Sequence, residues 1–372
     1  MKKVFSALLT FPTLVRYTSE SGTPPFSVSI LKISEIMKKL LISIIVVAVA
    51  NAAHAQSNEL SFSQSGNGNQ ASSVSQKGSA NTGSIAVAGD NNVSTFDQRG
   101  NNNQGALSIN GNGNRGLVQL YGNENEAIIT QVGNSNTGSA YSFGGNNSQV
   151  SIVQTGDNNS GYAHPSSGSY NQVAVIQAGN SNWGDAESYG GNNNQVSLTQ
   201  IGTNNGSEVY SIYGSNNQVR VAQTGNGNWG VAASYNGNNN QASLTQIGNS
   251  NGGVAGSSSG NDNQASVAQT GDNNLGYISS NNGSNNHANL VQRGNSNEAK
   301  LWQEGYFNEA AISQEGNNTL AGLESSSLPY ATEYANQRGE GNLLTLTQTG
   351  DGNMLHFGQV GNGNTATITQ GP

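Results

Sequence analysis

Residues 194–216 read NQVSLTQIGTNNGSEVYSIYGSN, and residues 217–239 follow the same plan with NQVRVAQTGNGNWGVAASYNGNN. Both copies hold Gln at the seventh position, Gly two residues after it and Asn five residues after it. This pattern recurs with a constant 23-residue spacing from Gln131 to Gln292. A fixed period in this range is typical of proteins that stack one structural unit many times. The repeat therefore favours a solenoid over an irregular globular fold.

The residues that precede each Gln alternate in character. The second residue before it is Ile, Leu or Val and the fourth is Ala or Val, whereas the intervening residues vary among types such as Ser197 and Thr199. An alternation with a period of two predicts a β-strand with one packed face. The Gly and Asn that follow tolerate positive φ, which predicts a tight arc after the strand.

Four columns of repeated residues define the expected core. We expect the Gln and Asn amides to form ladders, the apolar side chains to pack inside the coil, and the glycines to make the turns. The ladder glutamines are Gln64, Gln131, Gln154, Gln177, Gln200, Gln223, Gln246, Gln269, Gln292, Gln303, Gln314, Gln348, Gln359 and Gln370. The ladder asparagines are Asn136, Asn159, Asn182, Asn205, Asn228, Asn251, Asn274 and Asn297. The apolar core residues are Ile129, Ile152, Val175, Leu198, Val221, Leu244, Val267 and Leu290. The turn glycines are Gly133, Gly156, Gly179, Gly202, Gly225, Gly248, Gly271 and Gly294.

A second strand fits within each unit. In one copy its alternate residues are Gly184, Ala186 and Ser188, and Gly191 and Asn194 follow. The first strand presents large side chains and the second presents small ones. Folding the unit back as an arch therefore sets large residues against small ones, and we expect the two sheets to approach more closely here than the usual ~10 Å.

The composition supports stacking rather than an ordinary core. The chain has 50 glycines, 9% charged residues and 33% hydrophobic residues in 372 positions. So little apolar surface cannot offset the loss of chain entropy in an irregular fold. In a stack of parallel coils that rise by about 4.8 Å, each buried amide bonds to its copies above and below. The expected fold class is all-β, a solenoid of strand-arc-strand coils with cross-β stacking.

Outside the 23-residue array the Gln positions follow an average 11-residue spacing, and both strands carry Gln. Counting strand positions from Gln64 to Gln370 predicts 28 strands, or about 14 coils. Two places break the pattern, because Pro165 stands at a Ser position and residues 319–336, with Pro329, depart from the repeat. Pro removes a ladder donor, so each place is expected to hold a defect, a bulge or a loop.

Residues 1–55 differ in character from the rest of the chain. An apolar run over 40–50 follows two lysines and precedes Ala53-His54-Ala55. A basic start, a short apolar run and a small-residue site predict a secretory signal peptide over residues 37–55, cleaved between Ala55 and Gln56. The apolar run is too short to favour a membrane anchor. The protein is therefore expected to be secreted, with no anchor after cleavage.

Residues 1–36 are superfluous ahead of such a signal, and we interpret them as an over-extended gene model. Removal of residues 1–55 leaves seven of the 13 basic residues and 19 of the 21 acidic residues on residues 56–372. A nucleic acid is not an expected partner, because the remaining Lys and Arg are scattered singly. The chain has no cysteine, which suits an exported protein that forms no disulfide.

No sequence pattern indicates an enzyme, a metal site or a cofactor. No carboxylate pair, nucleophile motif or phosphate-binding loop recurs, and matches such as Gly66-Asn67-Gly68 arise by chance in a Gly-rich chain. The histidines of residues 56–372 lie far apart and are interpreted as exposed polar residues: His164, His287 and His356. The main alternative from another functional class is a capped, monomeric solenoid that acts as an adhesin or binds a ligand.

The repeat also resembles that of a known family. Segments such as Asn297–Gly305 follow the formula N-x-A-x-I-x-Q-x-G-x-x-N, which resembles the curlin repeat of the curli fibre subunits of bacterial biofilms. The resemblance covers residues 58–370. It implies a functional amyloid on the cell surface that serves biofilm matrix and adhesion, export through an outer-membrane pore, and nucleation by a minor subunit.

Two features depart from the family pattern. The family's major subunits carry a Gly-rich export segment ahead of the first repeat, whereas Asn58–Gln64 begins the repeat within three residues of the expected cleavage site. The chain also has more repeats than the familiar subunits. We expect a major fibre subunit that polymerises head to tail through open terminal coils, because the repeat stays regular to Thr365–Gln370. The minor nucleator, which usually ends in a basic, irregular repeat, is the alternative.

Overall fold

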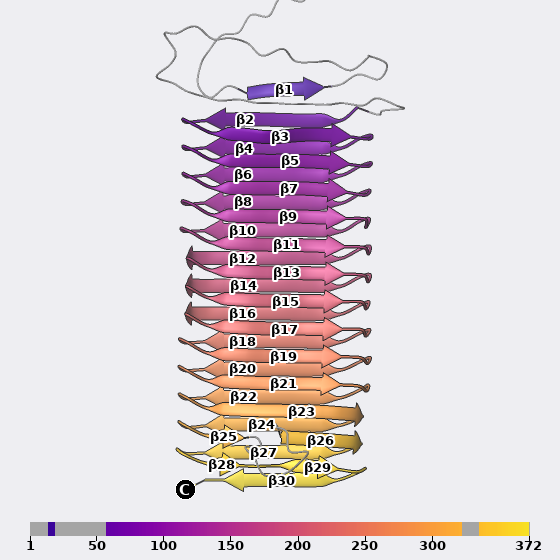
Figure 1. Ribbon diagram of the computed structural model, residues 1–372, viewed down its shortest axis with the longest axis vertical. Coiled ribbons are helices and arrows are strands. Elements are labelled where there is room, and N and C mark those ends of the chain that lie inside the picture. Colours follow the sequence, from indigo (N-terminus) through magenta and orange to yellow (C-terminus); the bar gives the residue numbers. More distant parts are fainter. Residues whose placement is uncertain (1–13, 19–56, 322–334, 372) are drawn as a thin grey trace, which may run out of the picture.

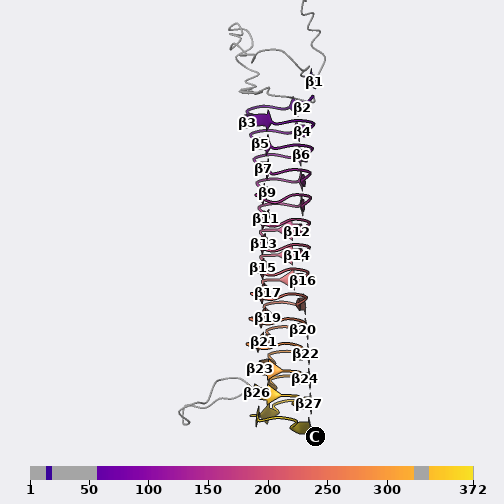
Figure 2. The ribbon, with the colours of Figure 1, turned by 90° about the vertical axis from the view of Figure 1, so that its right-hand side faces the viewer.

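The computed structural model describes residues 14–18, 57–321 and 335–371. Its strands stack into a tall column with two flat walls, sheet A and sheet B (Figures 1 and 2). The chain runs along sheet A, turns through an arc, returns along sheet B and turns again. Within the described ranges all regular secondary structure is β-strand. These ranges contain no helix that is long and apolar enough to cross a membrane. The predicted all-β solenoid is confirmed.

Sheet A begins with β1 (Leu14–Thr18), which pairs antiparallel with β2, and every later pair in the sheet is parallel. The solenoid strands of sheet A are β2 Glu59–Ser65, β4 Thr82–Ala88, β6 Gln104–Asn110, β8 Glu126–Val132, β10 Gln149–Thr155, β12 Gln172–Asn180, β14 Gln195–Thr203, β16 Gln218–Asn226, β18 Gln241–Ile247, β20 Gln264–Thr270, β22 His287–Arg293, β24 Glu309–Glu315, β27 Leu343–Thr349 and β30 Thr365–Gln370. The strands of sheet B are β3 Gln70–Lys77, β5 Val93–Arg99, β7 Arg115–Tyr121, β9 Thr137–Phe143, β11 Ser160–Ser166, β13 Trp183–Tyr189, β15 Gly206–Ile212, β17 Trp229–Tyr235, β19 Gly252–Ser258, β21 Leu275–Asn281, β23 Glu298–Tyr306, β25 Leu320–Ala321, β26 Ala335–Glu340, β28 Met354–Leu355 and β29 Gly358–Val360.

Equivalent positions of the repeat pair directly with one another. Between β14 and β16, for example, Leu198 lies beside Val221 and Gln200 lies beside Gln223. A register shift occurs between β3 and β5, at Ala71 and Ser73, where the repeat pattern does not predict one. In-register pairing places each side chain above its own copy, which is the condition for a side-chain ladder.

The solenoid has one strand fewer than the sequence count predicts. Over the described residues, the 15-stranded sheet A consists of β1 and 14 solenoid strands, and sheet B has 13 strand positions. They make 13 full turns closed by β30. The prediction counts an extra strand within residues 319–336, but β25 and β26 are two parts of one strand position, because both pair with β23. Residues 322–334, between them, lie outside the described residues.

Pro165 does not interrupt its strand. β11 continues through it, and Pro165 pairs with Ser188 of β13. Toward β9, however, the pairing skips His164 and Pro165, because Pro has no N–H to donate. Of the three expected outcomes, the residue therefore causes a local defect in the ladder and not a bulge or a loop.

Large side chains of one sheet pack against glycines of the other. In the middle turns the large residues belong to sheet A, where Leu244 Cδ2 lies 2.3 Å from the place that a Cβ on Gly230 would occupy. Near the N-terminal end the roles are reversed. Phe96 of sheet B is fully buried, and its Cζ lies 2.5 Å from the place of a Cβ on Gly105 of sheet A. Contacts this close require that one of the two strands has no side chain.

Candidate assembly interface

The Gln column of sheet A forms a continuous ladder from β8 to β30. Each Nε2 donates one hydrogen to Oε1 of the Gln in the next turn, over distances of 2.7–3.0 Å. The other hydrogen goes to a backbone carbonyl at the start of the opposite strand, as from Gln200 to the Trp183 oxygen at 2.8 Å. Because both hydrogens are used, the core contains these amides without an unpaired donor.

In the described strands of sheet B, Gln occupies the ladder position only near the two ends. Gln76 donates to Gln98 at 2.7 Å, and Gln303, Gln337 and Gln359 form a second run at 2.8 Å. Between the two runs the same position holds mostly Ser, and the Ser280 hydroxyl closes the gap by donating to Gln303 at 3.0 Å. The middle turns therefore carry Gln in sheet A alone, whereas the first turn and the last turns carry it in both sheets.

The predicted Asn column lies in the arc that leads from sheet A to sheet B. Asn159 donates its backbone N–H and its Nδ2 to Oδ1 of Asn136 in the preceding turn, at 2.9 and 3.1 Å. Its Nδ2 also donates to the Gly179 carbonyl at 2.7 Å. An equivalent ladder occupies the other arc, from Asn58 and Asn81 to Asn364, and was not among the predicted ladder residues. Each inner Asn thus binds both the turn before it and the turn after it.

An outer ladder runs along the turn tips, and sequence interpretation missed it. The Asn134 backbone N–H and Nδ2 donate to Oδ1 of Asp157 at 2.7 and 3.0 Å, and Asn249 donates in the same way to Asp272. Asp157 and Asp272 do not recur in every repeat of the sequence, because Asn and Ser occupy the same position in other turns. All three residue types supply the one acceptor oxygen that this position needs. The signal that could have found them is their constant place one residue after the turn glycine.

The ladders give the column a direction. Each Gln amide donates to the Gln of the turn toward the C-terminal end, whereas each inner Asn donates to the Asn of the turn toward the N-terminal end. The remaining Nδ2 hydrogen of the Asn goes to a Gly carbonyl of the following turn. The N-terminal face therefore presents Gln acceptors with Asn donors, and the C-terminal face presents Gln donors with Asn acceptors. Only a head-to-tail contact between two columns pairs every donor with an acceptor.

The eight predicted turn glycines all adopt positive φ, between 107° and 125°. An L-residue rarely adopts this region. A Cβ at Gly202 would also lie 1.9 Å from the Gly225 carbonyl oxygen of the next turn. These positions require glycine both for the backbone conformation and for the close stacking of successive turns.

The other predicted site residues fall in three groups. The eight apolar residues, Ile129 to Leu290, are all buried in the core. Gln64 is buried but does not join a ladder, because its neighbour in β4 is Val87, and its amide has no partner among the described residues. The cleavage site at Ala55 and Gln56 lies outside the described residues.

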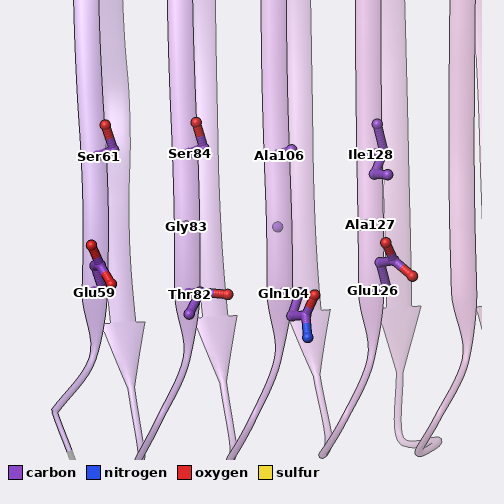
Figure 3. A pocket seen from close by; sticks show the side chains of 11 residues that line it. Glu59, Ser61, Thr82, Gly83, Ser84, Gln104, Ala106, Glu126, Ala127 and Ile128 are labelled. Carbon is purple, nitrogen blue, oxygen red and sulfur yellow. The ribbon is translucent and has the colours of Figure 1, made fainter.

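A shallow groove crosses the outer face of sheet A near the N-terminal end (Figure 3). The glycines Gly83 and Gly105 and small side chains form its floor, and Glu59 and Glu126 lie along one side of it. The two carboxylates stand on strands β2 and β8, with β4 and β6 between them. Over the described residues no group of acidic or His side chains could hold a metal ion. The groove is a consequence of the small residues that fill these strands.

His164 is a half-buried member of a charged cluster, which corrects its interpretation as an exposed residue. Its Nε2 lies 3.2 Å from Asp185 Oδ1, and its Nδ1 lies 3.7 Å from Glu187 Oε1. Burial alone would lower the pKa of His164, but the carboxylates of Asp185 and Glu187 raise that pKa above 6.5 overall. Burial raises the pKa of Glu187. The 23-residue spacing between His164 and Glu187 is the signal that could have found this pair.

The raised pKa of His164 gives a test by pH. A protonated His164 stabilises the fold by up to about 1 kcal/mol, and this contribution is complete below pH 6.5 and is lost as the pH rises through the folded-state pKa. We expect His164→Gln to lower the denaturation midpoint at pH 5.5 more than at pH 8.5. The matched control is His287→Gln, which changes an exposed side chain on sheet A. An equal loss at both pH values would contradict the ion pair.

In a comparison with known protein families, the repeat segments of the chain match one family. The Curlin associated repeat family matches five segments of the chain, residues 191–225, 214–248, 260–294, 294–326 and 339–371. No curated protein matches the chain. The matched segments lie between the arc before β14 and the end of β30, and they leave residues 249–259 and 327–338 unmatched. Both the family and the solenoid fold are structural rather than enzymatic. The chain therefore contains five segments that match the curlin associated repeat, which supports its resemblance to the family of curli-like fibre subunits.

Proposed function

We propose that residues 56–372 form the major structural subunit of an extracellular, curli-like amyloid fibre that grows head to tail. The observation that carries the proposal is the complementarity of the two end faces. Among the described residues, β30 is paired only with β27, so its outer edge has backbone groups for another strand. A free strand edge templates the addition of a further strand. The ladder groups at the opposite face match that edge in donors and acceptors.

The choice of the major subunit over the minor nucleator rests on the regularity of the last turns. The Gln ladders continue to Gln359 in sheet B and to Gln370 in sheet A, so the growing end offers a complete repeat. By family resemblance, the partners are a nucleator subunit and an outer-membrane export pore, and the fibre serves biofilm matrix and adhesion. Secretion follows from the signal peptide interpretation of residues 37–55.

The strand β1 occupies the N-terminal edge of sheet A, which the proposed head-to-tail contact would use. Residues Leu14–Thr18 pair antiparallel with Glu59–Ser63 of β2, so they cover the N-terminal face. We expect purified residues 56–372 to form fibres that bind thioflavin and give cross-β diffraction near ~4.8 Å. A chain that keeps residues 1–55 is expected to show a longer lag and slower growth, measured by the same thioflavin assay.

A seeding experiment shows whether residues 1–55 slow fibre growth by covering the edge of β2 or by changing the solubility of the chain. Preformed fibres of residues 56–372 should recruit fresh residues 56–372 at once but recruit the longer chain slowly. If residues 56–372 remain monomeric after prolonged incubation, with no thioflavin response, the fibre proposal fails. That outcome would favour the capped, monomeric adhesin instead.

A further inference from the structure

We propose that successive subunits of the fibre are related by a half-turn about the fibre axis, so that sheet A of one subunit continues sheet B of the next. The proposal rests on the proposed function, because it describes the contact between fibre subunits. Its partner is a second copy of this chain. Its basis is the number of strands in the solenoid.

The first and the last strand of the described solenoid lie on the same sheet. Both β2 and β30 belong to sheet A, and Figure 1 shows that they run in the same direction, opposite to β3. Because strands alternate between the sheets along the chain, the described solenoid has 14 strands in sheet A and 13 strand positions in sheet B. The position that continues the coil beyond β30 is therefore in sheet B.

Direct stacking without rotation leaves that position empty. In this arrangement β2 of the next subunit lies below β30 in sheet A, and its β3 is the next strand available in sheet B. Between β29 and that β3 there is then a gap one strand wide, twice the spacing of about 4.8 Å. The facing edges of both strands lose their backbone partners, and the coil interior opens to water.

A half-turn about the fibre axis fills every position. The rotated β2 lies below β28 and β29 in sheet B, and the rotated β3 lies below β30 in sheet A. A half-turn exchanges the two walls and reverses the direction of each strand as viewed from one side. Strands of sheet A therefore arrive in sheet B with the direction that sheet B already has, and all pairs at the junction remain parallel.

Gln64 is an independent observation that a Gln donor belongs above it. The residue is 7% exposed, and neither Oε1 nor Nε2 has a hydrogen-bond partner among the described residues. The pairing of β1 with β2 ends at Ser63, before Gln64. In the rotated stack, Gln64 lies beside Gln359, whose Nε2 donates one hydrogen to the Leu343 oxygen and retains a second. That second hydrogen meets the Gln64 acceptor. In the unrotated stack Gln370, whose Nε2 donates to the Met354 oxygen, lies beside Gln64 instead, so Gln64 supports the head-to-tail contact and the strand count selects the half-turn.

The end turns are built alike in both sheets, as a rotated junction requires. Gln64 and Gln76 occupy equivalent positions in β2 and β3, and Gln359 and Gln370 do so in β29 and β30. Asn stands five residues after Gln64, Gln76 and Gln359 alike, at Asn69, Asn81 and Asn364. In the middle turns the arc after sheet B is longer, with Asn194 six residues after Ser188. A half-turn within the middle turns would set Ser against Gln and a long arc against a short one.

Cysteine cross-linking distinguishes the two junctions. The chain has no cysteine, and residues 57–321 and 335–371 contain all the described strands of the solenoid, so the experiment uses residues 56–372. In the rotated fibre Ser65 pairs with Val360 of the neighbouring subunit, and in the unrotated fibre Ser63 pairs with Thr369. When two such residues pair on neighbouring strands, their Cα atoms lie within the range that a disulfide can bridge, about 4.4–6.8 Å. All four side chains point outward from the solenoid. Within one subunit each pair spans the length of the column.

Fibres of two double variants are assembled under reducing conditions and then oxidised with oxidised glutathione, which takes up the electrons of the two thiols as the disulfide forms. We expect S65C/V360C to give covalent oligomers after dissolution in formic acid, and S63C/T369C to remain monomeric. Peptide mapping of the disulfide identifies the junction, and the four single variants control for other contacts. Cryo-electron microscopy of the unmodified fibre should show a rotation near 180° for each rise of about 65 Å.

Oligomers from S63C/T369C, with none from S65C/V360C, would overturn the half-turn while leaving the fibre in place. Fibres in which neither pair cross-links would overturn it as well, because the junction would then use other strands. The absence of fibres from unmodified residues 56–372 would overturn the proposed function and this inference together.

Discussion

Replacing Gly202 by Ala is expected to lower the free energy of unfolding by roughly 2–6 kcal/mol, from backbone strain together with overpacking. Gly202 has φ +125°, and the Cβ of alanine would lie 1.9 Å from the Gly225 carbonyl oxygen. That oxygen cannot move aside easily, because it accepts a hydrogen bond from Asn205 Nδ2 at 2.8 Å. The change is measured as a shift of the denaturation midpoint of monomeric residues 56–372, and as the loss of fibre growth.

Gly227→Asn is the matched control for this prediction. Gly227 also has positive φ, at +63°, but the equivalent positions of the turns before and after it hold Asn204 and Ser250 at 55° and 56°. A Cβ on Gly227 would meet only the Ser250 hydroxyl, at 3.8 Å. We expect a change within about 0.5 kcal/mol. Equal losses in the two variants would show that any turn substitution is harmful and that the carbonyl contact is not the cause.

Replacing Gln200 by Ala is expected to have an effect of similar size, a loss of roughly 3–6 kcal/mol in the free energy of unfolding. The substitution removes the donors to the Gln223 amide and the Trp183 carbonyl, at 2.9 and 2.8 Å. It also leaves Gln177 Nε2 without its Oε1 acceptor. Each of these buried groups is left without a partner, and the missing side chain leaves a cavity. Denaturation midpoints and thioflavin growth rates measure the effect.

The control for the ladder is Thr199→Ala, one residue earlier on the same strand. Thr199 faces outward and is half-buried, so its truncation removes surface area without leaving an unpaired amide. We expect a change within about 0.5 kcal/mol. A Gln200→Ala variant as stable as Thr199→Ala would mean that the amide ladder contributes little beyond its strand.

The regular part of the fold could be predicted because two constraints act together. A side-chain period of two decides which face of a strand is buried, and the 23-residue spacing decides which residues pair between turns. With both fixed, Leu198 can lie inside only if Thr199 lies outside, and Gln200 can lie beside only one other Gln of the next turn. For this reason the buried face of each strand and the register between turns can be predicted from the amino-acid sequence alone.

The exceptions could not be predicted, since each depends on contacts between residues that the period does not relate. Residues 319–336 do not follow the repeat, and the sequence there does not show whether the chain forms an additional strand. In the structure, β25 and β26 share one strand position instead. The reversal at Phe96 depends on which residue faces Gly105 across the core. The position of Asp157 shows no fixed residue type in the sequence, because any side chain with a hydrogen-bond acceptor oxygen, such as Asn, Asp or Ser, can occupy it.

The opposed directions of the two kinds of ladder have an electrical consequence for a fibre of any length. Each amide carries a dipole, and the dipoles within one ladder add along the fibre axis, as they do in an α-helix. The dipoles of the Gln ladder point one way, and those of the inner Asn ladders point the other way. The two contributions oppose each other, so the inner Asn ladders offset part of the axial dipole of the Gln ladder within every turn. In a fibre built from such columns, this offset would reduce the axial polarisation that each added subunit contributes.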